Sequence, residues 1–462
     1  MASSSLASEP SVCNGGREKI MGTALPKTAN HDGFPGFDGV RWLAAWAVVF
    51  SHSYSIATGS KALDPIASVL GDGNSFGNYA VRAFFILSGF LLMRSLDHER
   101  SDPLRFLFNR LLRIVPGFCF AIIVTILVLG PFLSGLSLKD LLLSNEAWSS
   151  IYWSIAGLGD FSSLPAHASR YPSLASFVNG SLWSIPYELV CYLFLLSLHM
   201  LLRSAKAVGI VATIVSLIAL LGPRMGWTTT EMDAGSNLLH LPLIMLDKTL
   251  PYFCGGVAFH SIHKRWPYSQ KILTIAALAL LGSGFFRLQI EFFAFCAPAL
   301  IVWIGRWAWI SRPMRNTGDV SYGIYLFGWP VTLVAALKIN APSPLLVFFA
   351  SVPFVLLFAF LMRRWVEKPV NDWLKPAILR RVPRFAESRA PASSLSSLQQ
   401  WIQRLAYWGF FLGLVRFVFY PWPGSANWFG NQIYQLGILA CLVALTLRIV
   451  QRQRPGNSTA KA

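Results

Sequence analysis

Arg41 and His52 stand in the first long apolar stretch of the chain, VRWLAAWAVVFSHSYSIATG. Charged groups are rare in membrane helices because their burial in hydrocarbon is costly, and those present usually face the bundle interior and mark chemistry or a pathway. At about 100° and 1.5 Å per residue, this spacing places both side chains on one helix face, roughly 16 Å apart. The pair could bind an anion at one end and perform acid–base chemistry at the other. An interfacial arginine with a structural histidine is an equally open interpretation.

Arg110 and Arg113 form a second candidate site, in FNRLLRIVPGF at the cytoplasmic start of the third apolar stretch. Residues three apart lie on one face of a helix. Two planar guanidinium groups there would suit phosphate, which they bind through paired hydrogen bonds. The alternative is an ordinary basic anchor at the membrane surface.

Glu188 is the carboxylate most able to assist His52. It lies in SLWSIPYELVCYLF, near the outer end of its apolar stretch. Helix rise places it roughly 9 Å from the outer face of a core about 30 Å thick, and His52 roughly 18 Å from the inner face. We therefore expect the two at similar depth, where a carboxylate would orient the imidazole and raise its basicity. A Glu188 satisfied by a neighbouring Tyr, Trp or backbone group is the other interpretation.

Composition identifies the class of protein that holds these residues. The chain has 462 residues, of which 54% are hydrophobic and only 13% charged, which indicates an integral membrane protein. We predict an all-α polytopic bundle with about ten core spans and a C-terminal two-helix hairpin. The predicted spans lie near 38–58, 79–96, 114–134, 182–202, 207–222, 239–262, 272–286, 289–310, 319–338, 343–365, 401–420 and 429–448.

The net charge of +18 reports orientation in the membrane. With the N-terminus in the cytoplasm, most lysines and arginines fall in cytoplasmic loops, as the positive-inside rule requires. We therefore expect contact with anionic lipid and no nucleic-acid partner.

The six cysteines are scattered without metal-ligand spacing, so we expect no metal site. The polar N-terminal segment has no apolar stretch before a cleavage site, so no cleaved signal peptide is predicted.

The chain divides into one membrane domain with appendages. We predict a disordered cytoplasmic tail over 1–37, a membrane domain over 38–372 and a cytoplasmic linker over 373–400. A transmembrane hairpin over 401–450 and a cytoplasmic tail over 451–462 follow. Within the domain, Asp319 is expected to cap the helix that follows it, and Glu367 to pair with a nearby Arg or Lys.

Six motifs in order over about residues 36–372 resemble the acyltransferase-3 family of bacterial membrane sugar and polysaccharide O-acyltransferases. They are GFDGVRWLAAWAVVFSH, AVRAFFILSGFLL, RLLRIVPGF, SLWSIPYEL, DVSYGIYLFGWP and WVEKPV. The resemblance implies that Arg41 helps to bind acyl-CoA and that His52 is the catalytic histidine. Arg110 and Arg113 match the paired-arginine motif of the family, and Glu188 its glutamate after the LWS motif. The implied fold is a bundle of about ten helices around a central acyl-CoA pore.

Two positions depart from the family pattern. Arg82 stands where many members carry an acidic residue, and Gly328 where many carry the His of YLWHWP. Both point to a subgroup with a different acceptor environment. The fused extracytoplasmic hydrolase-like domain of some members is absent from this sequence.

The resemblance implies an O-acyltransferase of the bacterial inner membrane. It would transfer an acyl group, with acetyl expected, from acyl-CoA to a carbohydrate or glycolipid hydroxyl, without a bound cofactor. Polysaccharide synthesis proteins are further expected partners.

Two other classes of function stay open from the residues alone. A transporter or flippase for lipid-linked sugars would use Arg41 and His52 for substrate or proton passage. A non-catalytic subunit of a polysaccharide synthesis complex would not depend on His52.

Overall fold

The computed structural model describes residues 34–60, 63–71, 73–98, 103–157, 178–202, 204–225, 248–263, 270–284, 288–314, 317–339 and 343–381. Every regular element in these ranges is a helix, which confirms the all-α class. The predicted hairpin over 401–450 and both predicted tails lie outside the described residues, apart from 34–37.

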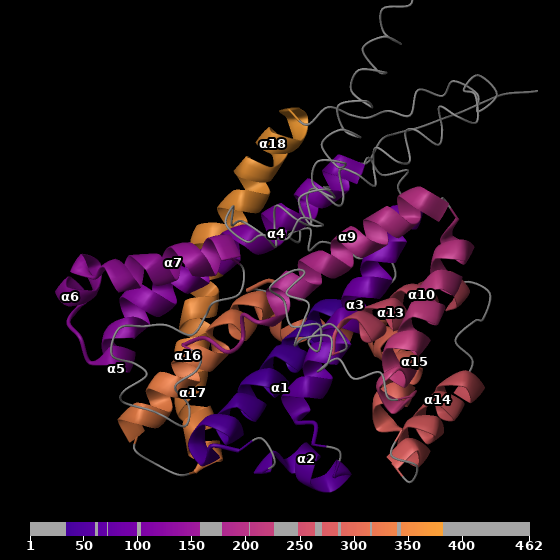
Figure 1. Cartoon of the computed structure of the whole chain (residues 1–462), viewed down its shortest axis with the longest axis horizontal. Coiled ribbons are helices and arrows are strands. Elements are labelled where there is room, and N and C mark those ends of the chain that lie inside the picture. Colours follow the sequence, from indigo (N-terminus) through magenta and orange to yellow (C-terminus); the bar gives the residue numbers. More distant parts are fainter. Residues whose placement is uncertain are drawn as a thin grey trace, which may run out of the picture.

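The longer helices form the body of the bundle (Figure 1). They are α1 (Phe37–Thr58), α3 (Phe76–His98), α4 (Pro103–Val124), α7 (Asn145–Gly157), α9 (Ser184–Leu202), α10 (Ala205–Leu221), α13 (Leu250–His263), α14 (Gln270–Ser283), α15 (Gln289–Ile304), α16 (Ser321–Ile339) and α17 (Pro344–Met362). The short helices are α2 (Pro65–Leu70), α5 (Gly130–Ser134), α6 (Leu138–Leu143) and α18 (Lys375–Arg381). Short stretches of other helix types occur at η2 (Thr125–Leu129), η3 (Pro223–Met225), η5 (Ala308–Met314), η6 (Arg363–Glu367) and η7 (Val370–Leu374).

Five described helical segments are long and apolar enough to cross a membrane: Phe76–Asp97, Arg105–Ser134, Ser184–Leu202, Ser321–Ile339 and Pro344–Arg380. A sixth arises if α15 and η5, bent by 74°, form one span. The protein is therefore a multi-pass membrane protein, and the number of ten core spans stays a prediction.

Helix α1, which carries Arg41 and His52, is not among these five. Its 22 residues could cross a bilayer core of about 30 Å, but its charged residues and serines make it less apolar. It packs against α3, α16 and α17, so its polar residues are placed inside the bundle. This position is the one in which ionisable groups are tolerated in membrane proteins.

One helical segment is much longer than the bilayer requires. Pro344–Arg380 comprises 37 residues, which at 1.5 Å per residue spans about 55 Å, against a hydrocarbon core of about 30 Å. Its last part, α18, projects from the bundle beside the start of α4 (Figure 1). The predicted linker over 373–400 therefore begins as a helix, through Arg381.

Small residues let α3 and α13 approach closely. A Cβ atom on Gly89 would clash with the carbonyl oxygen of Phe253, and one on Gly256 with that of Ile86. The two contacts run in opposite chain directions, so the helices are antiparallel. Close backbone approach through small residues stabilises membrane helix pairs, and the packing role predicted for the Ser88-Gly89 step holds for the glycine.

Substituting Gly89 with leucine should separate α3 from α13, because the clash is with backbone that cannot move aside. We expect a loss of about 1–3 kcal/mol or more of stability, measured as a lower melting temperature in detergent. Gly282→Leu is the matched control, since a Cβ there meets nothing within 4 Å. Equal melting temperatures for the two variants would contradict this account of the packing.

Candidate active site

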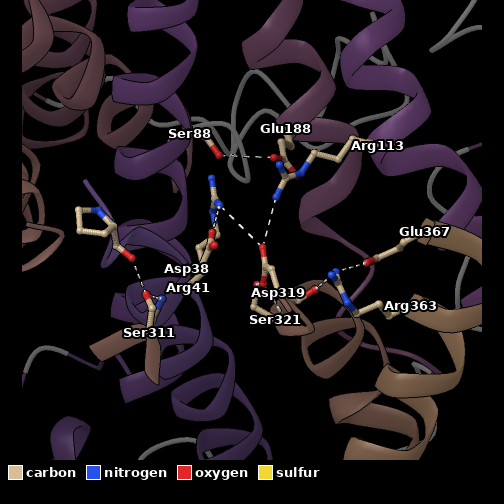
Figure 2. Close-up of polar contacts among 12 residues, drawn as sticks. Asp38, Arg41, Ser88, Arg113, Glu188, Ser311, Asp319, Ser321, Arg363 and Glu367 are labelled. Atoms are coloured by element: carbon tan, nitrogen blue, oxygen red, sulfur yellow. Dashed lines mark hydrogen bonds and ion pairs between the residues drawn. The ribbon is translucent and has the colours of Figure 1, made fainter. Parts of the chain in front are cut away.

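Asp319 lies at the centre of a charged cluster that joins four helical segments (Figure 2). Its Oδ2 is 3.8 Å from Nη1 of Arg41 and 3.5 Å from Nη2 of Arg113. Its Oδ1 accepts hydrogen bonds from the backbone nitrogen of Ser321 at 3.0 Å and from the Ser321 hydroxyl at 2.5 Å. The predicted capping role is thus confirmed, and the same carboxylate also bridges two of the predicted site arginines.

The Asp319 carboxylate stays charged because its partners outweigh its burial. Burial opposes ionisation, but Arg41, Arg113 and the hydrogen bonds from Ser321 together hold the pKa of Asp319 below its ordinary value. Arg41 is also paired with Asp38, at 3.1 Å between Nη1 and Oδ1. The first predicted cation is therefore fixed in place by two carboxylates.

Arg363 ties the last long helix to the same cluster. Its Nη1 donates a 2.8 Å hydrogen bond to the backbone carbonyl of Asp319 and lies 3.7 Å from Oε2 of Glu367. This ion pair confirms the expectation that Glu367 pairs with a nearby basic residue. Figure 2 shows both contacts beside the bridging carboxylate.

A cavity of about 100 Å³ opens next to this cluster. Four of the five predicted site residues line it: Arg41, Arg110, Arg113 and Glu188. The rest of its wall is aromatic, apolar or hydroxyl-bearing: Val81, Phe84, Phe85, Ser88, Leu92, Ile114, Ser184, Ile185, Tyr192, Ser321, Tyr322 and Tyr325. Three cations with an amphipathic wall could hold an anionic group attached to a long, weakly polar chain.

Glu188 belongs to the arginine end of the site. Its Oε1 accepts a short hydrogen bond from the Tyr192 hydroxyl and a 3.5 Å one from Ser88. The second interpretation of Glu188, satisfaction by a neighbouring tyrosine, therefore describes its main contact. Sequence reasoning assigned Ser88 to packing and did not single out Tyr192. Tyr192 lies one helical turn after Glu188, and Ser88 lies on another helix. Neither contact can be recognised from the sequence before the arrangement of the helices is known.

His52 lies farther along α1 and is not among the cavity-lining residues. Its ring meets the ring of Trp329 edge-on, with centroids 4.9 Å apart and an angle of 81°. A Cβ on Gly328 would lie 3.9 Å from Nδ1 of His52 and only 2.7 Å from Val49. The glycine that replaces the expected family histidine thus allows α16 to pack closely on α1 beside His52.

Helices α1 and α16 run side by side in the same direction. Asp319 pairs with Arg41 at one end, and Trp329 contacts His52 at the other. Between these points the Tyr325 hydroxyl shares a 2.7 Å hydrogen bond with Ser184. The cation and the imidazole are therefore separated by roughly 16 Å along α1, and both lie beside α16.

The expected equal depth of Glu188 and His52 differs from the observed arrangement. Residues 178–183, which precede α9, are mostly buried. Asn179 donates a 3.0 Å hydrogen bond to the carbonyl of Leu326, and Gly180 lies against Trp329. Helix α9 therefore starts near the level of His52 and carries Glu188 toward Arg41. The depth estimate assumed that α9 began at the outer membrane face.

Arg82 is buried, with 5% of its surface exposed, and is not among the cavity-lining residues. It donates a 2.7 Å hydrogen bond to the side-chain oxygen of Asn74 and lies over the rings of Tyr79 and Tyr252 at 5.1 and 5.0 Å. Cation–π contacts of this kind compensate part of the cost of burying a guanidinium.

Within the described ranges, no cluster of three or more His, Cys, Asp or Glu side chains could bind a metal ion.

Comparison with known proteins decides the family. A family model described as an acyltransferase domain matches residues 34–364, most of the chain. The chain belongs to the acyltransferase-3 family. The match includes all five predicted site residues and ends near η6.

Two curated relatives extend this result. The O-acetyl transferase of Shigella phage Sf6 is 27% identical over 343 residues, which cover 72% of this chain and 94% of the phage protein. A protein of Komagataeibacter xylinus described as a membrane-bound transacylase, BcsY, is 24% identical over 331 residues, 67% of this chain and 75% of its own length. No solved structure matches the chain.

Asp319→Asn should weaken the cluster, because Arg41 and Arg113 would lose their shared counter-charge. Breaking a buried ion pair costs about 3–5 kcal/mol. We expect about 1–3 kcal/mol here, since the side chain of Arg113 is 45% exposed and its charge is partly screened by solvent. A melting temperature in detergent measures this loss, with the exposed Asp372→Asn as control.

The pH dependence of the melting temperatures of wild type and Asp319→Asn tests whether the loss of stability is electrostatic. A carboxylate with a depressed pKa stabilises the fold fully above its unfolded pKa of about 3.9, and this contribution is lost as the pH falls through the folded pKa. The gap in melting temperature between wild type and Asp319→Asn should therefore be constant near neutral pH and close below about pH 4. A gap independent of pH would exclude a charge effect.

Proposed function

We propose that this protein transfers an acyl group, most simply acetyl, from acyl-CoA to a carbohydrate hydroxyl. The observation that carries the proposal is the convergence of Arg41, Arg110 and Arg113 on one cavity, with His52 farther along the helix that carries Arg41. The family and the printed names of its relatives support acyl transfer. The acyl-CoA donor and the carbohydrate acceptor are part of the proposal.

The donor fits the charge distribution of the site. Acyl-CoA carries its phosphates at one end and its thioester at the other, joined by an extended pantetheine arm that can bridge roughly 16 Å, the axial distance between Arg41 and His52. Guanidinium groups bind phosphate oxygens in pairs. The phosphates would meet the arginines, and the arm would run past Tyr322 and Tyr325 toward His52.

His52 is proposed as the general base. Its imidazole would remove the proton of the acceptor hydroxyl as the oxygen attacks the thioester carbonyl carbon. The new C–O bond forms an ester, the C–S bond breaks, and the proton on His52 passes to the CoA sulfur to release the thiol. Imidazole suits both transfers because its ordinary pKa lies near neutral pH.

Glu188 is proposed to act at the donor end. Its hydrogen bonds to Tyr192 and Ser88 place a carboxylate next to the arginines of the cavity. There it would limit the net positive charge and hold the arginine side chains in the orientation that the phosphates need. This makes Glu188 a positioning residue for donor binding, in place of the catalytic role first predicted for it.

The proposed setting is the bacterial inner membrane, with both termini in the cytoplasm. This orientation gives the arginine end of the cavity access to cytoplasmic acyl-CoA and follows the charge of the loops. The proposed acceptors are exopolysaccharide, lipopolysaccharide or lipo-oligosaccharide. Polysaccharide synthesis proteins are the corresponding partners, and surrounding anionic lipids would contact the basic loops.

His52→Ala should abolish acyl transfer without preventing membrane insertion. Loss of a general base typically costs 10²–10⁴-fold in rate. Cells that express wild type, His52→Ala, the matched control His199→Ala or no protein are compared for base-labile ester on surface polysaccharide by NMR. Membrane levels are compared by immunodetection.

Ester that appears with wild type and His199→Ala and disappears with an equally abundant His52→Ala would support the proposal. Retained ester in His52→Ala would contradict the role of the histidine. CoA release by purified protein in detergent separates transfer from transport, because a transporter would release none.

A further inference from the structure

The start of α4 and the helical extension that ends in α18 are held together outside the cavity. Nη2 of Arg105 donates a 2.7 Å hydrogen bond to the backbone carbonyl of Leu379. The two helices contact each other along this stretch and project from the same end of the bundle (Figure 1). Because α4 enters the bundle where the α17–α18 segment leaves it, they run antiparallel.

This arrangement brings Lys375 to the level of Arg110. Counted from the Arg105–Leu379 hydrogen bond, Arg110 lies five residues on along α4, a rise of about 7.5 Å. Lys375 lies four residues back along α18, about 6 Å in the same direction. The two cations are close enough to repel each other electrostatically, and Arg113 adds to that repulsion.

The cations of this group differ in their counter-charges. Arg113 shares Asp319 with Arg41. The ring of Phe106 lies 5.5 Å from the guanidinium carbon of Arg110, whose buried Nε has no hydrogen-bond partner among the described residues. No carboxylate of the described residues lies within ion-pair distance of Arg110 or Lys375. A bound anion would relieve the repulsion between them.

We infer that Arg110 and Lys375 form a subsite for a phosphomonoester dianion at the mouth of the cavity. This inference rests on the function proposed above and divides the donor between two sites. The diphosphate would lie nearer Arg41 and Arg113, and the 3′-phosphate of CoA would bind between Arg110 and Lys375. A lysine ammonium suits this position because it acts as a mobile point charge.

The position of Lys375 in the chain places one half of the subsite outside the matched domain. The family match ends at residue 364, eleven residues before Lys375. The subsite therefore depends on the continuation of α17 into α18, which the Arg105–Leu379 hydrogen bond holds against α4.

The test compares binding of CoA and of 3′-dephospho-CoA to the purified full-length protein in detergent, by titration calorimetry. Wild type should bind CoA roughly tenfold more tightly, as expected for a charge-assisted contact to one phosphate. Lys375→Gln should weaken CoA binding by a similar factor and leave dephospho-CoA binding unchanged. Lys368→Gln is the matched control, an exposed lysine on the same segment, and should behave as wild type.

The other outcomes overturn the inference in distinguishable ways. Equal binding of both ligands by wild type would remove the 3′-phosphate subsite and leave acyl-CoA as the donor. A preference that persists in Lys375→Gln would exclude Lys375. A loss in Lys375→Gln that depends on added anionic lipid, with ligand preference intact, would assign the site to a lipid headgroup. Binding of neither ligand by wild type would overturn the proposed donor and this subsite together.

Discussion

The arrangement of the site depends on one carboxylate held between two guanidinium groups. Charges taken out of water are costly unless they are paired and hydrogen-bonded. Asp319 meets both conditions, because one oxygen caps α16 through Ser321 and the other lies between Arg41 and Arg113. The start of α16 is thereby fixed relative to α1 and α4, and Arg363 adds the end of α17 through the backbone of the same residue. The cavity lies beside the point at which these helices meet.

Two consequences follow for chemistry. The counter-charge on Arg41 and Arg113 holds them in place before any ligand binds, so the donor need not order them. It also leaves the three arginines with different counter-charges, since Arg110 has no carboxylate within ion-pair distance among the described residues. A donor that carries several phosphates can use both kinds of site.

Sequence reasoning predicted the class of fold, the four cavity-lining site residues and the pairing of Glu367. These predictions rest on local properties, namely hydropathy, helix periodicity and charge spacing. The relation of Glu188 to His52 could not be predicted, because it depends on where α9 begins. That depth is set by the packing of Asn179 and Gly180 against α16. The bridging role of Asp319 was missed for a similar reason, since its partners are far away in the chain.

The parallel course of α1 and α16 places an unusual restriction on how this protein can evolve. Arg41 and His52 occupy one helix face only because eleven residues complete just over three turns. One inserted residue would rotate His52 by about 100° away from that face. The same insertion would also break the match with α16, whose own ends are tied to those of α1. An insertion or deletion in α1 should therefore be tolerated only if it comprises whole helical turns and is matched in α16, so that both the common face and the common length are kept while the side chains vary.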